Sequence, residues 1–225
     1  MVHPQKTRVA IVGGGYGGYA LAIRLDAHLD VTLIDAREAF VHNVAAIRAI
    51  VDPALTRQIV IPYDRLLKRG RFVCGRVIEI DASGVRLANG AAIEADIVVV
   101  ATGSHYAAPF KPQGDSAAEF SVRLAEVAAQ VREADRVAIV GAGAVGVELA
   151  GEIKAVFKDK PVALVSSADR LFPGYPAKLH GEIVRRLKAL GVELHLGDGA
   201  MRLDATDNPW FGELRLESGA RLSGL

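Results

Sequence analysis

Residues 8–18 of the chain read RVAIVGGGYGG, an apolar run that leads into a cluster of glycines. The run at 8–12 predicts a short buried strand, and the apolar residues at helical spacing in 19–25 predict a helix. A second apolar run at 30–35 predicts another buried strand. The order strand, glycine turn, helix, strand is typical of a βαβ unit that binds a dinucleotide.

Each glycine of the Gly13-x-Gly15-x-x-Gly18 pattern has a physical task. Gly13 permits a tight turn, Gly15 lets a pyrophosphate approach the backbone, and Gly18 lets the helix pack closely on the strand. Free N–H groups at the helix N-terminus attract phosphates, and Asp35 could accept both hydroxyls of an adenosine ribose. The candidate binding residues of this unit are Gly13, Gly14, Gly15, Tyr16, Gly17, Gly18 and Asp35.

The same unit recurs 128 residues later, where 136–141 repeats the six residues of 8–13. The pattern Gly141-x-Gly143-x-x-Gly146 leads into a predicted helix at 147–157 and a predicted strand at 162–165. A single repeat at so long a period indicates two nucleotide-binding domains of one architecture.

The second unit has no acid at the end of its second strand. The strand runs into Ser166 and Ser167, with Arg170 shortly beyond. A 2′-phosphate of NADP would not be repelled there, and Arg170 or Ser167 could bind it. The all-glycine pattern instead favours NAD, so the nicotinamide cofactor stays open as NAD(P).

The segment at 71–95 has a different pattern, which predicts short strands. They are separated by Ser83-Gly84 and by Asn89-Gly90, a strong hairpin signal. A buried strand at 96–100 then leads into Ala101-Thr102-Gly103. We therefore predict an α/β fold with two three-layer, Rossmann-like domains. The first spans 1–108 and includes the β-hairpin segment 71–95; the second spans 109–225.

Composition excludes several classes of function. The 27 basic and 26 acidic residues leave a net charge of +1, so no nucleic-acid partner is expected. Cys74 is the only cysteine, which excludes a disulfide framework, an internal redox-active pair and a cysteine-based metal site. No apolar run is long enough for a membrane span. We expect a cytoplasmic protein without a metal site.

Two dinucleotide sites in one chain predict electron transfer between two redox cofactors, a flavin and a nicotinamide. With these motifs, the chain resembles the FAD-dependent pyridine nucleotide oxidoreductases. The segments at 40–49 (FVHNVAAIRA) and 146–154 (GVELAGEIK) are similar to the group that contains the ferroptosis suppressor and apoptosis-inducing factor proteins. The resemblance implies an FAD-dependent NAD(P)H oxidoreductase with a quinone-like acceptor, and a full-length form could contact a membrane peripherally.

The resemblance also implies roles for single residues. The first glycine turn and Asp35 would hold FAD, and the second turn would face NAD(P)H. His42 is a candidate proton donor near the flavin, although a loop histidine without a role is the more frequent case. Further residues implied to contact FAD are Arg48, Val77, Ala101, Thr102 and Gly103, and those implied to contact NAD(P)H are Gly141, Gly143, Gly146 and Glu148.

The chain departs from the family's pattern in two ways. It has no cysteine pair after Asp35, which excludes disulfide reductase activity in its usual form. It also stops at Leu225, before the segment with which the family completes its FAD domain, so an incomplete FAD domain is expected, and the chain alone is expected to be poorly active. Two other interpretations stay open: a reductase of a ferredoxin or rubredoxin, and a nucleotide-binding module without turnover.

Overall fold

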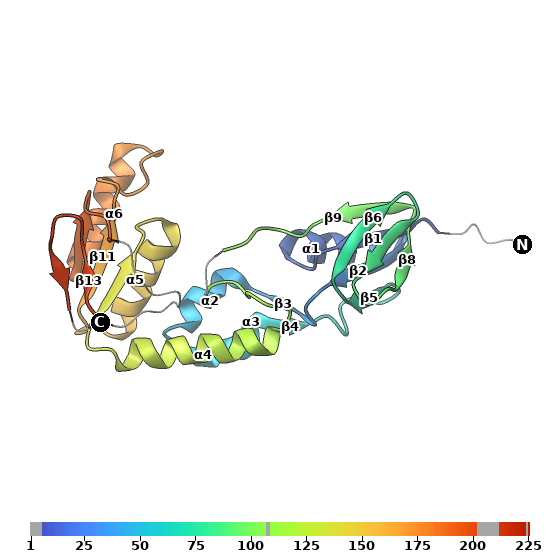
Figure 1. Ribbon diagram of the computed structural model, residues 1–225, viewed down its shortest axis with the longest axis horizontal. Coiled ribbons are helices and arrows are strands. Elements are labelled where there is room, and N and C mark those ends of the chain that lie inside the picture. The colour runs from blue at the N-terminus through green and yellow to red at the C-terminus, as the bar shows by residue number, and fades with distance from the viewer. Residues whose placement is uncertain (1–5, 107–108, 202–211, 224) are drawn as a thin grey trace, which may run out of the picture. The chain divides into compact units, whose positions relative to one another are not determined.

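The computed structural model describes residues 6–106, 109–201, 212–223 and 225, which form two compact units. The first unit comprises the residues up to Val44 together with Thr56–Arg123; the second comprises Ala45–Leu55 and Leu124–Leu225. Each unit contains a parallel sheet with helices (Figure 1), which confirms the predicted α/β fold class. The domain boundary predicted between 108 and 109 adjoins residues outside the described ranges and stays a prediction.

The first unit is built on a four-stranded sheet in the order β5-β2-β1-β9, with every pair parallel. Its two central strands are almost entirely buried, as their continuous apolar sequences predict. Of these two, the strand at 8–12 leads directly into the first glycine turn at the carboxyl edge of the sheet, where ligands of such folds bind. The strands are β1 (Arg8–Val12), β2 (Asp30–Asp35), β5 (Arg71–Cys74) and β9 (Ile97–Val100).

The two faces of this sheet are covered by different structures, because successive side chains of a strand point to opposite faces. Ile11 and Leu33 pack with Ala22 of helix α1 (Tyr16–Leu25) and with Tyr63. Residues of alternate positions, such as Ile34, pack against a three-stranded antiparallel sheet. The unit therefore has three layers: helix, parallel sheet and antiparallel sheet. The covering sheet consists of β6 (Val77–Asp81), β7 (Gly84–Leu87) and β8 (Ala92–Glu94).

Strand β5 does not belong to the hairpin segment, although that segment was predicted to begin at residue 71. β5 lies in the parallel sheet, where it pairs with β2 and places Cys74 opposite Asp35. The antiparallel sheet begins only at β6. The exposed Cys74 thiol donates a hydrogen bond to the carbonyl oxygen of Ala36 (3.5 Å).

A run of short elements for which the sequence analysis predicted no structure connects β2 to β5. Strands β3 and β4 pair in antiparallel fashion, and the helical turns lie between them. The pair lies next to α1, where the ring of Phe40 meets the ring of Tyr16 edge-on with centroids 5.1 Å apart. The elements are β3 (Ala39–Val41), α2 (Asn43–Ala49), η1 (Pro53–Leu55), α3 (Thr56–Ile59) and β4 (Val60–Pro62).

The second unit repeats the βαβ arrangement with a three-stranded parallel sheet in the order β10-β11-β12. One face packs against the β13–β14 hairpin through Ala163, Val165 and Leu214. Both helices of the sheet crossovers contact its strands. The elements are β10 (Val137–Val140), α5 (Ala144–Val156), β11 (Val162–Ser166), α6 (Ala177–Ala189), β12 (Val192–Leu196), β13 (Leu214–Arg215) and β14 (Arg221–Leu222).

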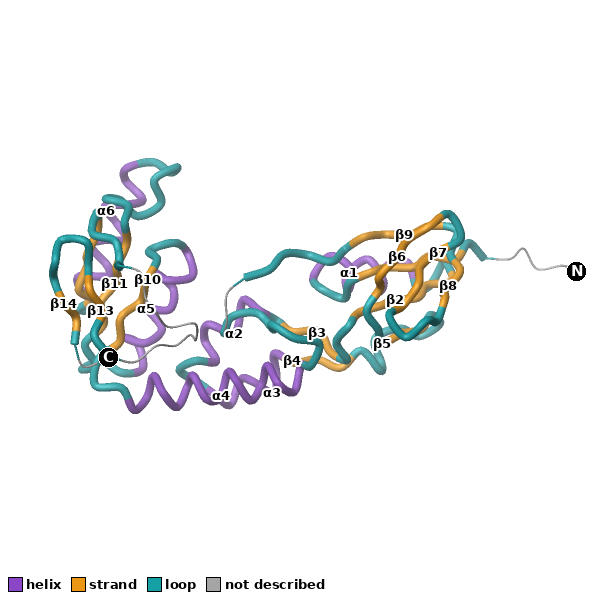
Figure 2. Tube along the Cα trace, viewed as in Figure 1, coloured by secondary structure: helices purple, strands orange, loops and turns teal. Residues whose placement is uncertain are grey.

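Helix α4 (Ala117–Glu133) contains the boundary between the two units, which falls between Arg123 and Leu124. Figure 2 shows it as one continuous helix. Its buried residues, which include Phe120, Leu124 and Val127, recur at helical spacing. The division between the units thus falls within a helix and not within a loop.

The carboxylate of Asp26 joins the end of α1 to the loop that precedes β5. It accepts backbone N–H groups from Lys68 (2.7 Å), Arg69 (3.1 Å) and Gly70 (2.6 Å). These hydrogen bonds, the one from Gly70 foremost, lower the pKa of Asp26. A lowered pKa means that this carboxylate stabilises the fold fully above its unfolded pKa of about 4, and that the stabilisation is lost as pH falls through the folded pKa.

We therefore expect Asp26→Asn to weaken the acid dependence of stability. Below about pH 4, the free energy of unfolding of the unchanged chain should fall more steeply with decreasing pH than that of the variant. Urea unfolding at a series of pH values measures both slopes. Asp64→Asn, which changes a carboxylate that is 71% exposed, is the matched control and should leave the slope unchanged. Equal slopes for Asp26→Asn and the unchanged chain would contradict the assignment.

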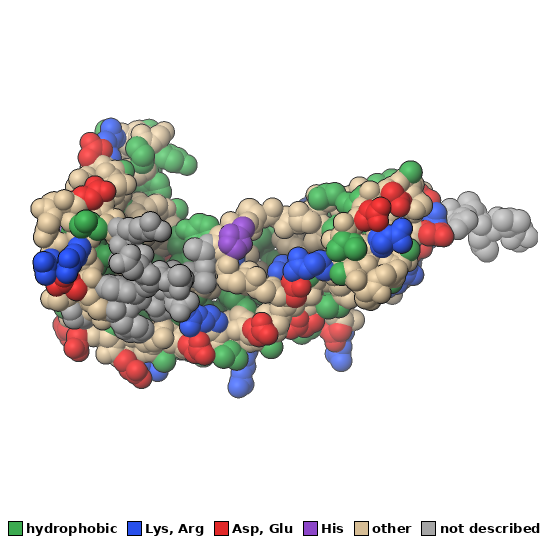
Figure 3. All heavy atoms as spheres, viewed as in Figure 1, with side chains coloured by type: hydrophobic (Ala, Val, Ile, Leu, Met, Phe, Trp, Pro, Cys, Tyr) green, Lys and Arg blue, Asp and Glu red, His purple; other side chains and the backbone are tan. Residues whose placement is uncertain are grey.

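The surface carries interspersed charges, as Figure 3 shows for one face. Arg8, for example, pairs with both Glu94 (2.5 Å) and Asp96 (2.7 Å) at the start of β1. Exposed pairs of this kind contribute little to stability. Within the described ranges, no helix combines the length and the apolarity needed to span a membrane.

Candidate functional site

The first glycine turn takes its shape from close backbone packing. Gly13 has φ +103°, and its N–H donates to the carbonyl oxygen of Ile34 (2.7 Å). A Cβ on Gly13 would collide with the carbonyl oxygen of Ala101, and one on Gly18 would collide with that of Gly13. These two glycines are therefore required by the turn and by helix packing, as their spacing predicted.

The side chains of Asp35 and Tyr63 hold the backbone of Gly14. Its N–H donates to Asp35 Oδ2 (2.7 Å), and its carbonyl oxygen accepts the hydroxyl of Tyr63 (2.7 Å). Both side chains are buried, and Asp35 Oδ1 also accepts the N–H of Arg37 (2.8 Å). Burial, followed by the charge of Asp35, raises the pKa of Tyr63, which keeps the hydroxyl protonated as a donor. The turn is thus fixed before any ligand binds.

Removal of the Tyr63 hydroxyl should cost stability. Tyr63→Phe leaves the carbonyl oxygen of Gly14 without this partner while the ring still fills its place. We expect the free energy of unfolding to fall by about 1–2 kcal/mol. Chemical denaturation measures the loss, and Tyr106→Phe, at a 44% exposed residue, is the control. A stability equal to that of the unchanged chain would show that the hydrogen bond contributes nothing.

The outer side of the same turn is open. An ideal Cβ on Gly15 or Gly17 would meet no heavy atom within 4 Å. Gly15 is the N-cap of α1, with φ −64° and no side-chain hydrogen bond to the first helical N–H groups. Free N–H groups beside uncovered glycines suit the close approach of a pyrophosphate. The turn therefore fits the predicted FAD.

Two neighbouring side chains, Tyr16 and His42, form a polar pair beside this turn. The Tyr16 hydroxyl lies 2.8 Å from His42 Nδ1 and accepts the N–H of Val44 (3.3 Å). The pair positions the imidazole of His42 without assigning it a chemical role, so its role as a proton donor stays a prediction.

The other residues implied to contact FAD have different surroundings. Ala101 directly follows β9 and donates its N–H to the carbonyl oxygen of Val12 (2.7 Å), so the predicted Ala101, Thr102 and Gly103 segment adjoins the first turn. Val77 packs beside the core between the two sheets. Arg48, in the second unit, pairs with Glu152 of α5 (2.6 Å). Its predicted contact with FAD is not tested by this pair.

The second glycine turn repeats the first. Gly141 has φ +108°, and a Cβ on Gly146 would collide with the carbonyl oxygen of Gly141. Gly143 is the N-cap of α5, again without a side-chain hydrogen bond, and its Cβ would point into open space. Glu148 lies exposed on α5, just beyond its first turn. The second turn therefore fits a dinucleotide phosphate as well as the first does.

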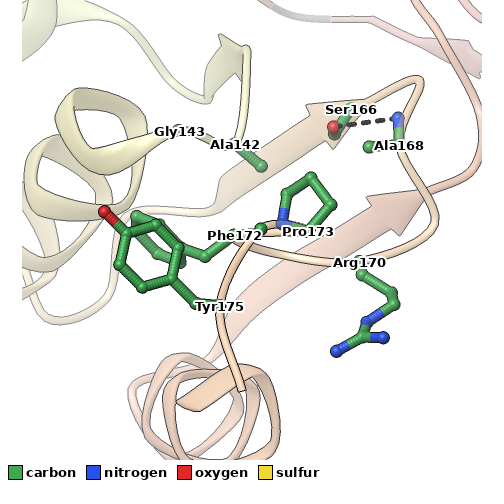
Figure 4. Close-up of a pocket in the computed structure, with 9 residues that line it drawn as sticks. Ala142, Gly143, Ser166, Ala168, Arg170, Phe172, Pro173 and Tyr175 are labelled. Carbon is green, nitrogen blue, oxygen red and sulfur yellow. Dashed lines mark hydrogen bonds between the residues drawn. The ribbon is translucent and has the colours of Figure 1, made fainter. Parts of the chain in front are cut away.

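A cavity of about 290 Å³ opens beside Gly143 (Figure 4). Most of its wall comes from the loop after β11, and of the lining residues in that loop only Arg170 was predicted to contact a ligand. Phe172 has the positive φ of 52°, rare for a bulky residue, and its ring meets that of Tyr175 edge-on at 5.9 Å. The cavity is lined by Ala142, Gly143, Ser166, Ala168, Arg170, Phe172, Pro173, Gly174 and Tyr175.

Two glycine turns, each open at a helix N-terminus and one of them backed by a buried acid, define a protein with two dinucleotide sites. Comparison with known families supports this. Residues 7–222 match the model of the pyridine nucleotide-disulphide oxidoreductases, and the chain belongs to this family. FAD and NAD(P)H are the cofactors of this oxidoreductase class, as the resemblance implied.

More specific relatives belong to the predicted group. The chain is 38% identical over 203 residues to apoptosis-inducing factor homolog B of Dictyostelium discoideum, covering 86% of this chain and 52% of the relative. It is 34% identical over 212 residues to human ferroptosis suppressor protein 1, covering 90% and 56%. The chain therefore spans about half the length of these relatives.

Solved structures share the fold. The reductase in a covalent putidaredoxin reductase–putidaredoxin complex matches 98% of this chain and 57% of its own, with a TM-score of 0.77 and 18% identity. At this identity, the match confirms the architecture of the chain but not its acceptor. Among the described residues, no group of three or more acidic, histidine or cysteine side chains is placed to hold a metal ion.

Proposed function

We propose that the chain provides the FAD and NAD(P)H sites of an oxidoreductase that passes electrons to a quinone-like acceptor. The observation that carries this proposal is the pair of open glycine turns with different strand ends. The first turn is backed by the buried carboxylate of Asp35, whereas the second opens into a cavity that Ser166 lines. Two unlike sites of one architecture suit two different dinucleotides.

The residues of the chain act by holding and orienting these cofactors. When bound, FAD accepts hydride from NAD(P)H and releases electrons singly or in pairs. The N–H groups at the start of α1 and of α5 would hold the two pyrophosphates. Asp35 and Tyr63 hold Gly14 so that the first turn need not rearrange on binding. With a single cysteine, the chain has no internal dithiol to which electrons could pass.

The quinone part of the proposal rests on the similarity to the ferroptosis suppressor and apoptosis-inducing factor group. A ferredoxin-type reductase is the second candidate. Docking of an acidic partner would favour a basic face, and a net charge of +1 gives no sign of one. A binding module without turnover is the third candidate.

The visible absorption spectrum separates these candidates. We expect a purified chain supplied with FAD to show flavin absorption that bleaches when NADH or NADPH is added without oxygen. Addition of a soluble quinone should then restore the oxidised spectrum. Restoration by ferredoxin but not by quinone would favour the second candidate, and FAD that binds but never bleaches would favour the third. A chain that binds neither dinucleotide would overturn the proposal.

A further inference from the structure

The two units of the chain can be superposed position by position at their strand ends, and this identifies the residue that replaces the acid. Gly13 N–H donates to Ile34 O (2.7 Å), and Gly141 N–H donates to Val165 O (2.8 Å). Ile34 and Val165 are therefore equivalent, and the next residue is Asp35 in one unit and Ser166 in the other. Ser166, and not Ser167, occupies the position that faces the adenosine ribose.

The two residues form the same local turn but carry different charges. Asp35 Oδ1 accepts the N–H of Arg37 (2.8 Å), and Ser166 Oγ accepts the N–H of Ala168 (3.2 Å). Asp35 has a second oxygen, which binds Gly14, and serine has none. The second site thus presents a neutral, shorter side chain where the first site has a buried carboxylate. A dianionic phosphate would be repelled in the first site and has room in the second.

The charge of the second cavity is positive. Arg170 is the only charged residue among the described residues that line it, and no ion pair or hydrogen bond of its guanidinium with the described part of the chain is found. Asp169 does not line the cavity, and its Cβ lies beside Gly197 after β12. In Figure 4, the Arg170 side chain extends away from Ser166, so binding a phosphate at Ser166 requires its rotation.

In the sequence, the all-glycine pattern of the second turn favoured NAD. The structure shows that its third glycine, Gly146, is needed for another reason. A Cβ on Gly146 would collide with the carbonyl oxygen of Gly141, just as one on Gly18 would collide with that of Gly13. Both units need glycine there for helix packing, although only one of them ends its strand with an acid. Gly146 therefore does not discriminate between the two cofactors.

We propose that the cavity beside Gly143 prefers NADPH to NADH, with Ser166 leaving room for the 2′-phosphate and Arg170 neutralising it. The proposal rests on the proposed function, because it assumes that the second turn holds the nicotinamide cofactor. It goes further in naming which of the two cofactors binds and which residues select it. A charge-assisted contact between arginine and phosphate supplies the preference.

Calorimetric titration of the 225-residue chain tests this without any turnover. We expect NADP⁺ to bind at least about tenfold more tightly than NAD⁺, and 2′,5′-ADP more tightly than 5′-ADP by a similar factor. Arg170→Ala should weaken NADP⁺ binding about tenfold and leave NAD⁺ binding within about twofold. Arg221→Ala removes the same charge on β14, outside the cavity, and should change neither.

A gain-of-charge variant tests the other residue. Ser166→Asp should abolish the preference for NADP⁺ and retain NAD⁺ binding. Heat that persists in Gly143→Val reports binding at the first turn and is subtracted. Equal affinities, or tighter binding of NAD⁺, in the unchanged chain would overturn the preference. A preference for NADP⁺ without flavin reduction would support it and would contradict the proposed oxidoreductase instead. Binding of neither dinucleotide would overturn both.

Discussion

Replacement of Gly143 by valine should abolish the reduction of bound flavin by NAD(P)H while FAD stays in place. The fold accepts this change, because an ideal Cβ on Gly143 meets no heavy atom within 4 Å and the backbone has φ −78° and ψ −172°. Valine adopts such extended angles readily. The new side chain would occupy the space through which the pyrophosphate reaches the N-terminus of α5.

The measurement is the anaerobic bleaching of flavin absorption by NADH and by NADPH, with the FAD content determined on the same sample. Gly151→Val is the matched control, since Gly151 lies on the same helix with equally open surroundings. The control should be reduced at a rate close to that of the unchanged chain. If Gly143→Val loses FAD and still binds the nicotinamide cofactor, the two sites have been assigned in the wrong order.

Asp35→Ala should weaken FAD binding by about 10- to 100-fold, which corresponds to about 1.5–3 kcal/mol for lost charge-assisted hydrogen bonds. The structure adds a second reason for this loss, because the carboxylate also holds the N–H of Gly14 and the turn would loosen without it. Binding of NADP⁺ at the second turn should stay unchanged. Fluorescence titration with FAD, followed by calorimetry with NADP⁺, gives both affinities.

Tyr63→Phe separates the two reasons. It removes the other hydrogen bond to Gly14 but keeps the acid, so a loss of FAD affinity shared by both variants would report loosening of the turn. A loss confined to Asp35→Ala would report the contact with the ribose. FAD affinity that is the same in Asp35→Ala as in the unchanged chain would contradict the assignment of the first site.

The repeated βαβ units could be predicted from the sequence because their signals are local. In each unit, the two apolar runs and the glycine pattern between them lie within about 30 residues of chain. The runs at 30–35 and 162–165 are the second strands of the two units. The strands predicted at 8–12 and 30–35 agree with β1 and β2 to the residue. Short βαβ signals of this kind depend little on the rest of the chain.

The structure of 39–62 could not be predicted in this way. Its strands β3 and β4 have three residues each and pair across intervening helical turns, so neither pattern reaches a detectable length. β5 was grouped with the hairpin segment because both are short apolar runs. Only the long-range pairing with β2 distinguishes it.

The residues of the candidate sites could be predicted only in part, because some of their contacts join residues that are far apart in the sequence. Gly13 and Gly18 belong to a spaced pattern whose physical tasks the structure reproduces, and Asp35 ends the second strand where the pattern places it. Tyr63 lies 49 residues from the glycine it holds, and no local signal connects the two. The identity of Ser166 as the counterpart of Asp35 also required the paired hydrogen bonds of both units, since the two strands end among several polar residues.

A label attached to strand β5 can report on the first site. Its last residue, Cys74, is exposed and is the only cysteine of the chain, so a fluorophore attached there would mark one defined position. That position lies opposite Asp35 across the β2–β5 pair. Partial desolvation, followed by nearby carboxylates such as Glu38, raises the pKa of the exposed thiol, so attachment proceeds best in mildly alkaline buffer. The emission of such a label would follow the filling of the first turn independently of the flavin's own colour.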